Sequence, residues 1–171
     1  DNTIIIFTSD HGFHLGSKNL VEKSTLWNDG TAVPFVIKVP GQPQQFINEP
    51  ISLVDLYPTL LEYGQIPEPE SHELDGKPVQ SIISGNASGS AIMIGAAKEN
   101  LEVGELTQVE HSHHGYARGN FKYILYSSGE DELYKISDDF REVNDLSLLQ
   151  NFQGVRNILY TQLKEKIGYI R

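Results

Sequence analysis

The chain has 171 residues, of which 39% are hydrophobic and none is cysteine, and its net charge is -10 at pH 7. This length suits one domain, or a domain with a small appendage. The absence of cysteine excludes a disulfide framework. The negative charge opposes nonspecific binding to nucleic acids and anionic membranes, and no apolar stretch approaches the roughly 20 residues of a membrane span. An anionic substrate is not excluded, because a bound metal and a lysine can reverse the field inside one pocket.

The first 40 residues predict two strands separated by a loop. The apolar run Thr3–Phe7 predicts a buried strand inside a parallel sheet that is covered on both faces. Pro34–Val39 predicts a second strand, which Pro40-Gly41 ends. The chain enters the first strand without an initiator Met or a signal sequence, so we expect it to be the C-terminal piece of a larger protein.

The next segment predicts a helix with one buried face. Apolar residues recur at helical spacing through Leu53–Tyr63, with Ser52 as N-cap and Gly64 as C-cap. Pro58 lacks a backbone N–H, so it should kink or restart this helix. A short helix is expected at Val79–Ile83.

The second half predicts a small sheet followed by a helix. The small residues of Gly85–Ser90 indicate a boundary between subdomains 1–84 and 85–171. Helical spacing marks a final helix over Ser147–Ile167. Gly119-Asn120 and Ser127–Glu130 indicate hairpin turns among four short strands at Ala91–Ala96, Gly115–Arg118, Lys122–Tyr126 and Glu132–Ile136.

Chemistry concentrates at the end of the first strand, in Thr8-Ser9-Asp10-His11-Gly12. Asp10 offers the hard oxygen ligands that Ca²⁺ and Mg²⁺ prefer, and His11 can ligate a metal or hydrogen-bond an anion. Ligands gather at the carboxyl ends of strands in α/β sheets, which is where this pair lies. Lys23 can bind an oxyanion as a point charge. Together these residues predict a metal-and-anion site.

The other candidates each leave two interpretations open. His14 lies on the same loop and either contacts substrate or faces water. His111, His113 and His114 have the spacing of a metal cluster, but a surface strand edge or a pocket wall is favoured. Arg118 either meets an anionic substrate or pairs with one of the nearby acids, and the second is favoured.

Nine segments of the sequence resemble, in order, the second half of the type I sulfatases. The resemblance implies the α/β fold of the alkaline-phosphatase-like superfamily, a mixed sheet flanked by helices, completed by a small four-stranded antiparallel sheet with a C-terminal helix. It is nearest the branch of iduronate and glycan sulfatases. The segments are Thr8–Gly16, Lys23–Trp27, Val33–Ile37, Pro40-Gly41, Ser52–Leu61, Leu74–Gly76, Ala117-Arg118, Lys122–Ile124 and Glu132–Tyr134.

The resemblance also implies roles for individual residues. The pair matching Asp10 and His11 helps to ligate calcium in the family, with Mg²⁺, Mn²⁺ or Zn²⁺ as alternatives here. The lysine matching Lys23 contacts the sulfate group and is the catalytic candidate, and His14 and His114 are candidates for substrate binding. The expected substrate is a sulfated small molecule or glycan, and the family location is periplasmic, secreted or lysosomal.

Sulfatases use a formylglycine made within a Cys/Ser-x-Pro/Ala-x-Arg motif, and these 171 residues contain no such motif. The N-terminal Asp-Asp metal ligands of the family are also absent, so we expect the missing N-terminal part of the same protein to be a partner and this chain to be inactive alone. Two alternatives stay open: a phosphodiesterase or phosphonate hydrolase of the same superfamily, and a non-catalytic fragment that binds glycan or a partner protein.

Overall fold

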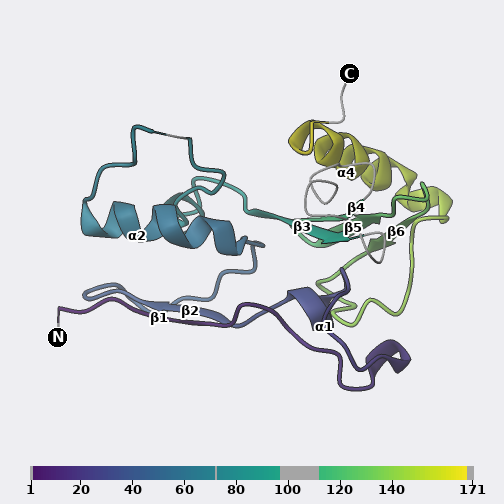
Figure 1. Ribbon diagram of the computed structural model, residues 1–171, viewed down its shortest axis with the longest axis horizontal. Coiled ribbons are helices and arrows are strands. Elements are labelled where there is room, and N and C mark those ends of the chain that lie inside the picture. Colours follow the sequence, from purple (N-terminus) through teal and green to yellow (C-terminus); the bar gives the residue numbers. More distant parts are fainter. Residues whose placement is uncertain (1, 72, 97–111, 169–171) are drawn as a thin grey trace.

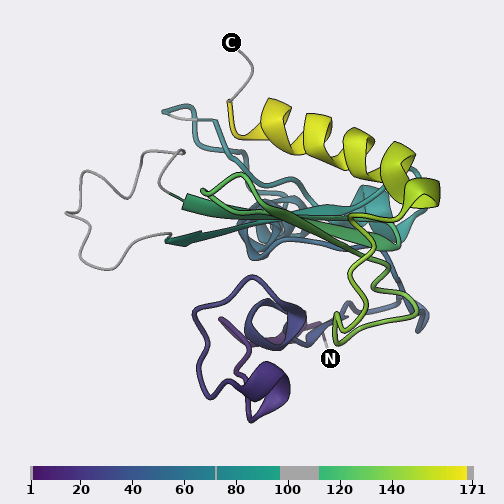
Figure 2. The ribbon, with the colours of Figure 1, turned by 90° about the vertical axis from the view of Figure 1, so that its right-hand side faces the viewer.

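The computed structural model describes residues 2–71, 73–96 and 112–168. Their centre is a four-stranded antiparallel sheet in the order β3-β4-β5-β6, with strands at Ser90–Ala96, Ser112–Arg118, Phe121–Leu125 and Asp131–Tyr134. Helix α4, Gln153–Lys166, covers one face of the sheet, and the N-terminal segment around α1, Asn28–Thr31, covers the other (Figures 1 and 2). The expected four strands and C-terminal helix are confirmed.

The β4–β5 and β5–β6 turns have the glycines that their backbone requires. Gly119 has a φ of 53° between β4 and β5, and Gly129 has a φ of 91° between β5 and β6. Such positive φ values are easy for glycine and uncommon for other residues. Local turn chemistry therefore sets the meander that the sequence predicts.

Hydrophobic side chains pack on both faces of the sheet. Tyr123 and Leu133 face α4, where they pack with Tyr116, Leu159 and Leu163. On the opposite face, Ile124 and Tyr134 pack with Leu26 from the N-terminal segment. Neighbouring residues of β5 thus serve different cores, because side chains alternate across a strand.

The first two strands form a separate ribbon. Strand β1, Ile5–Thr8, pairs antiparallel with β2, Phe35–Lys38, and Phe7 lies opposite Val36. The expectation that the first strand is buried among parallel neighbours is wrong for the described chain, because Ile5, Phe7 and Val36 are 53%, 65% and 59% exposed. The apolar run was interpreted as burial on both faces, yet one face of the ribbon is open.

Helix α2, Leu56–Gly64, lies beside the ribbon (Figure 1). A 3₁₀ turn precedes it, and the backbone N–H of Ser52 donates to the Asp55 carboxylate at 2.9 Å, as expected of a capped start. The helix restarts ahead of Pro58, which sits in its first turn where a missing N–H costs little. Its last helical residue is Gly64, and the cap itself is Gln65 with a φ of 53°.

The bounds of two further helices agree in part with the sequence prediction. Helix α3 spans Gln80–Ile83, as expected. Helix α4 begins at Gln153, six residues later than expected, because residues 145–147 are held in a turn against β6. The Asp145 carboxylate accepts the N–H groups of Leu133 and Ser147, at 3.0 and 2.9 Å. Across the described ranges, the helices are all too short or too polar to cross a membrane.

Candidate functional site

The turn that follows β1 rests on helix α1. The N–H of Gly12 donates to the carbonyl oxygen of Gly30 at 2.9 Å. A Cβ atom at Gly12 would lie 2.3 Å from the carbonyl oxygen of Asp29, closer than any side chain can approach. Glycine therefore allows the turn carrying Asp10 and His11 to approach α1 closely.

Asp10, His11 and Lys23 converge at this turn. The Nδ1 atom of His11 donates to the Gly12 carbonyl at 2.8 Å, because a carbonyl oxygen can only accept. This leaves the Nε2 lone pair available, and Lys23 Nζ donates to it at 3.0 Å. Asp10 Oδ2 lies 3.5 Å from the same Nε2 atom. The sequence predicted these residues as a group, and the structure brings them together.

The cluster is open to solvent. The side chain of Asp10 is 84% exposed and that of His11 is 39% exposed. The neighbouring His11 charge and hydrogen bonds from the backbone hold the pKa of Asp10 below its ordinary value. Asp10 is therefore ionised at neutral pH, next to the His11 imidazole.

The Asp10 carboxylate and the His11 imidazole suit part of a metal coordination shell. A carboxylate oxygen and an imidazole Nε2 whose opposite nitrogen donates to a carbonyl are a common ligand pair. Within residues 2–71, 73–96 and 112–168, no group of three or more His, Cys, Asp or Glu side chains could hold a metal ion. Asp10 and His11 can thus supply two ligands, and a full shell needs others.

His14 is completely buried, so the interpretation of a histidine facing water is wrong. Its Nδ1 pairs with Ser17 Oγ at 2.8 Å and its Nε2 pairs with Thr25 Oγ1 at 2.7 Å. Its ring also meets Trp27 edge-on, 6.2 Å between centroids. His14 therefore stabilises the loop that carries Lys23. A direct contact of His14 with substrate stays a prediction.

The structure does not bring His114 to the cluster. His114 shares its face of β4 with Tyr116, which packs under α4, whereas the N-terminal segment lies on the other face. His113 points to the N-terminal side and meets Tyr126 edge-on at 5.1 Å. Burial lowers the pKa of both histidines. His111 lies outside the described residues, and Arg118 is exposed at the end of β4.

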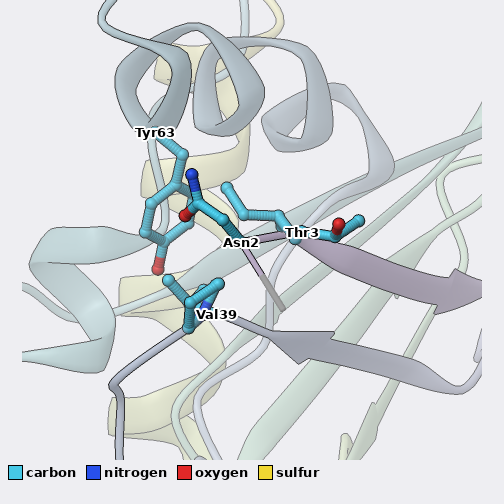
Figure 3. A pocket seen from close by; sticks show the side chains of 6 residues that line it. Asn2, Thr3, Val39 and Tyr63 are labelled. Carbon is cyan, nitrogen blue, oxygen red and sulfur yellow. The ribbon is translucent and has the colours of Figure 1, made fainter.

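A cavity of about 490 Å³ lies at the opposite end of the ribbon (Figure 3). It is lined by residues before β1, residues after β2 and Tyr63 from the end of α2. Asn2, Thr3, Ile4, Val39 and Pro40 complete the lining. None of these side chains is a carboxylate, an imidazole or an amine, in contrast to the cluster at the other end of the ribbon.

Sequence reasoning missed the contacts that hold α1. Lys122 and Glu142 form an ion pair of 2.8 Å, each 1% exposed, beneath this helix. A lysine within an expected strand and a glutamate in a loop gave no signal, since both residue types are mostly exposed. The Asn28-Asp29-Gly30 turn was the available clue, because its glycine indicates a close approach.

Known proteins match these features. Residues 1–66 match the family model Sulfatase. The Extracellular sulfatase SULF-1 homolog of Drosophila melanogaster is 41% identical over 85 residues, 48% of this chain and 8% of that protein. The Uncharacterized sulfatase YidJ of Escherichia coli K12 is 26% identical over 179 residues, 100% of this chain and 33% of that protein. The chain thus spans a third or less of the length of these relatives.

Solved structures share the fold. The structure of BT4656 in complex with its substrate D-glucosamine-2-N,6-O-disulfate has a TM-score of 0.75 at 22% identity, over 99% of this chain and 35% of that one. Phosphonate monoester hydrolase of Agrobacterium radiobacter has a TM-score of 0.74 at 22% identity, over 97% and 35%. The described chain therefore shares the fold of these enzymes. Its first 66 residues match the Sulfatase family model, and the chain is homologous to the C-terminal region of sulfatases.

Proposed function

We propose that this chain supplies the C-terminal half of an active site that hydrolyses sulfate esters. Asp10 and His11 are ligands of a Ca²⁺ ion, and Lys23 binds the sulfate group. The observation that carries this proposal is the meeting of three groups at one strand end: Lys23 Nζ lies 3.0 Å from His11 Nε2, and Asp10 Oδ2 lies 3.5 Å from the same atom.

The cluster suits the charge of a sulfate ester. A bound metal would neutralise charge on the ester oxygens, as metals do at phosphoryl and sulfuryl centres. His11 Nε2 has one lone pair, which accepts a Lys23 N–H here, so metal binding by Nε2 would release that N–H of the Lys23 ammonium. The same group can therefore also donate to a sulfate oxygen, and a positioned cation stabilises charge that develops on the leaving oxygen.

In this proposal, the rest of the active site comes from a further segment of the protein. Ca²⁺ takes six to eight oxygen ligands, roughly, so Asp10 and His11 form only part of its shell. Because the relatives are at least about three times as long as the region they share with this chain, we assign the formylglycine nucleophile and the other ligands to a further segment. The His11 nitrogen would also suit Mn²⁺ or Zn²⁺, and the carboxylate would suit Mg²⁺.

The open face of the ribbon supports the same assignment. Ile5, Phe7 and Val36 share this face and are more than half exposed. Exposed apolar strands usually pack against other protein, since burial of apolar area stabilises both partners. We infer that the further segment of the enzyme covers this face, which would convert the ribbon into the buried sheet that the sequence predicts.

A sulfated sugar is the favoured substrate class, and an iduronate or glycan sulfatase is the favoured branch. The solved structure of BT4656 holds a disulfated glucosamine. A phosphonate monoester hydrolase is an equally good match in fold, so the fold does not discriminate between the two chemistries. The sulfatase family model and the sulfatase relatives favour the sulfate ester.

Calcium binding by the chain tests the proposal directly. Calorimetry with millimolar CaCl₂ should give a weak, saturable signal, with water in the positions that the further segment would fill. Asp10→Ala and His11→Ala should each weaken it by about tenfold or more, since each removes one ligand of a shared ion. Asp138→Ala is the matched control, because Asp138 is also an exposed aspartate beside a lysine, 2.6 Å from Lys135. Equal losses in Asp138→Ala and Asp10→Ala would mean diffuse attraction to an acidic protein, and would contradict the proposed site.

A non-catalytic, glycan-binding chain would give a different result in a binding experiment with a sulfated sugar. The chain alone is expected to bind a sulfated sugar weakly and to release no sulfate from it. Tight binding that persists in Asp10→Ala and in the presence of a chelator would favour a glycan-binding module instead, because such binding would not need the metal.

A further inference from the structure

Helix α1 lies between the two turns that carry the candidate site. On one side it receives the Gly12 N–H at the Gly30 carbonyl, 2.9 Å away. On the other side, a Cβ atom at Gly30 would lie 2.8 Å from the carbonyl oxygen of Lys23 and 2.7 Å from Thr25 Oγ1. Both approaches need glycine, so a displacement of α1 moves the His11 turn and the Lys23 turn together.

Helix α1 is in turn held from the four-stranded sheet. The backbone N–H of Asn28 donates to Glu142 Oε2 at 2.5 Å. Lys122 Nζ, from β5, donates to Asn28 Oδ1 at 3.0 Å and to Thr31 Oγ1 at 3.3 Å. The Asn28 amide donates to the Phe140 carbonyl at 2.9 Å. The first and last residues of α1 are therefore both bonded to groups of the second subdomain.

Burial of the Lys122–Glu142 pair and the backbone conformation of Glu142 both cost free energy. Both side chains are almost completely buried, and burial lowers the pKa of Lys122 and raises that of Glu142. Glu142 also has a φ of 56°, which residues other than glycine seldom adopt. Apolar residues of similar size often stabilise a fold as well as a buried ion pair does. Stability alone therefore does not explain this pair, whereas orientation of α1 does.

We propose that Lys122 and Glu142 are positioning residues that orient Asp10, His11 and Lys23 through α1. The meaning of that site rests on the proposed function. In this arrangement the small C-terminal sheet does more than cover the first subdomain: it fixes the distance between the metal-binding turn and the sulfate-binding lysine. Lys18 adds to the same link, because its Nζ donates to the Glu142 carbonyl at 2.5 Å and lies 4.6 Å from the Trp27 ring.

The test uses the double variant Lys122→Met/Glu142→Gln in the full chain. It leaves no buried charge, and glutamine keeps an oxygen for the Asn28 N–H. The control is Asp131→Asn/Arg156→Met, which removes an ion pair of 2.5 Å on the α4 side of the same sheet. Two readouts are taken without metal or substrate: the hydrogen-exchange rate of the Gly12 amide, and the ¹⁵N chemical shifts of the His11 ring.

The proposal expects the Gly12 amide of the double variant to exchange at least about tenfold faster, because its bond to Gly30 opens more often. The His11 ring should lose its single Nδ1–H tautomer, while the control resembles the wild type in both readouts. Unchanged readouts in the double variant, or an equal change in the control, would overturn the proposal. If the double variant also loses protection throughout β4–β6, Lys122→Arg replaces it, since it keeps the charge but not the geometry of a single Nζ.

Failure of the proposed function gives a different result. A chain that binds no calcium, yet shows the loosened Gly12 amide in the double variant, would keep the positioning role and lose the sulfatase site. A chain that binds calcium with an unchanged affinity and an unchanged Gly12 amide in the double variant would keep the site and lose the positioning role.

Discussion

The four-stranded sheet and the β1–β2 ribbon differ in how much of their surface is covered. Tyr123, Ile124 and Leu133 of the sheet are fully buried, whereas Ile5 and Phe7 of the ribbon are more than half exposed. The candidate chemistry lies at the end of the less covered element. The buried core of the sheet and the candidate site thus lie in different parts of the chain, and α1 contacts both.

The largest expected effect is in the core of the sheet. Leu163→Ala should lower the free energy of unfolding by about 2–5 kcal/mol, because Leu163 is fully buried and its removal leaves a cavity. Phe7→Ala should change it by less than about 0.5 kcal/mol, because Phe7 is 65% exposed on the ribbon. Urea unfolding measures both changes.

Ile158→Ala serves as the control on the same helix, since Ile158 is 58% exposed. A loss in Phe7→Ala as large as that in Leu163→Ala would break the contrast between sheet and ribbon. It would mean that the ribbon is covered in the folded chain.

Two glycines should respond in opposite directions. Gly12→Ala should destabilise the chain by about 1–3 kcal/mol, because the new methyl group meets the Asp29 carbonyl at 2.3 Å. Gly154→Ala should stabilise it by up to about 1 kcal/mol, since nothing lies within 4 Å and alanine favours the helix. Thermal unfolding compares them, and a stabilising Gly12→Ala would show that the turn does not rest on α1.

The pH dependence of stability should come partly from the sheet. Burial lowers the pKa of His113 and His114 below their ordinary value of 6.5, with help from the Lys164 charge near His114. The unfolded chain then binds more protons than the folded chain below about pH 6.5. Stability from these groups is complete above that pH and decreases as the pH falls further.

The double variant His113→Gln/His114→Gln checks this direction. Its free energy of unfolding should decrease less than that of the wild type between pH 7 and pH 5. Equal decreases in the two proteins would assign the acid sensitivity to other groups.

Local sequence patterns predicted the four-stranded sheet, but they did not predict how β1 pairs or where α4 begins. Gly119 and Gly129 mark turns whose backbone needs glycine, so both hairpins were predictable. The antiparallel pairing of β1 with β2 was not, because an apolar run indicates burial without giving the direction of its neighbours. The start of α4 was missed because Asp145 holds the preceding turn, although apolar spacing continues through it.

The candidate site was predictable where neighbours in sequence carry it. Asp10 and His11 are adjacent at a strand end, Lys23 follows on the connection between the two predicted strands, and the family resemblance supplied its role. The burial of His14 depends on how its own loop folds, since its partners Ser17 and Thr25 are 3 and 11 residues away. The contacts of Lys122 depend on segments far apart in sequence, 94 residues for the bond to Asn28. Loop histidines and strand lysines are usually solvated, so only the tertiary structure reveals these supporting contacts.

Lys23 gives the most direct test of the central claim that one metal-and-anion site lies at the end of β1. In the presence of CaCl₂, binding of glucosamine 6-sulfate is compared between the wild type and Lys23→Met by titration calorimetry, with unsulfated glucosamine and a phosphonate monoester as reference ligands. We predict that Lys23→Met weakens binding of the sulfated sugar by about 10- to 100-fold, the cost of one charged hydrogen bond, and leaves calcium binding intact. Equal affinity of the two proteins for the sulfated sugar would contradict the claim.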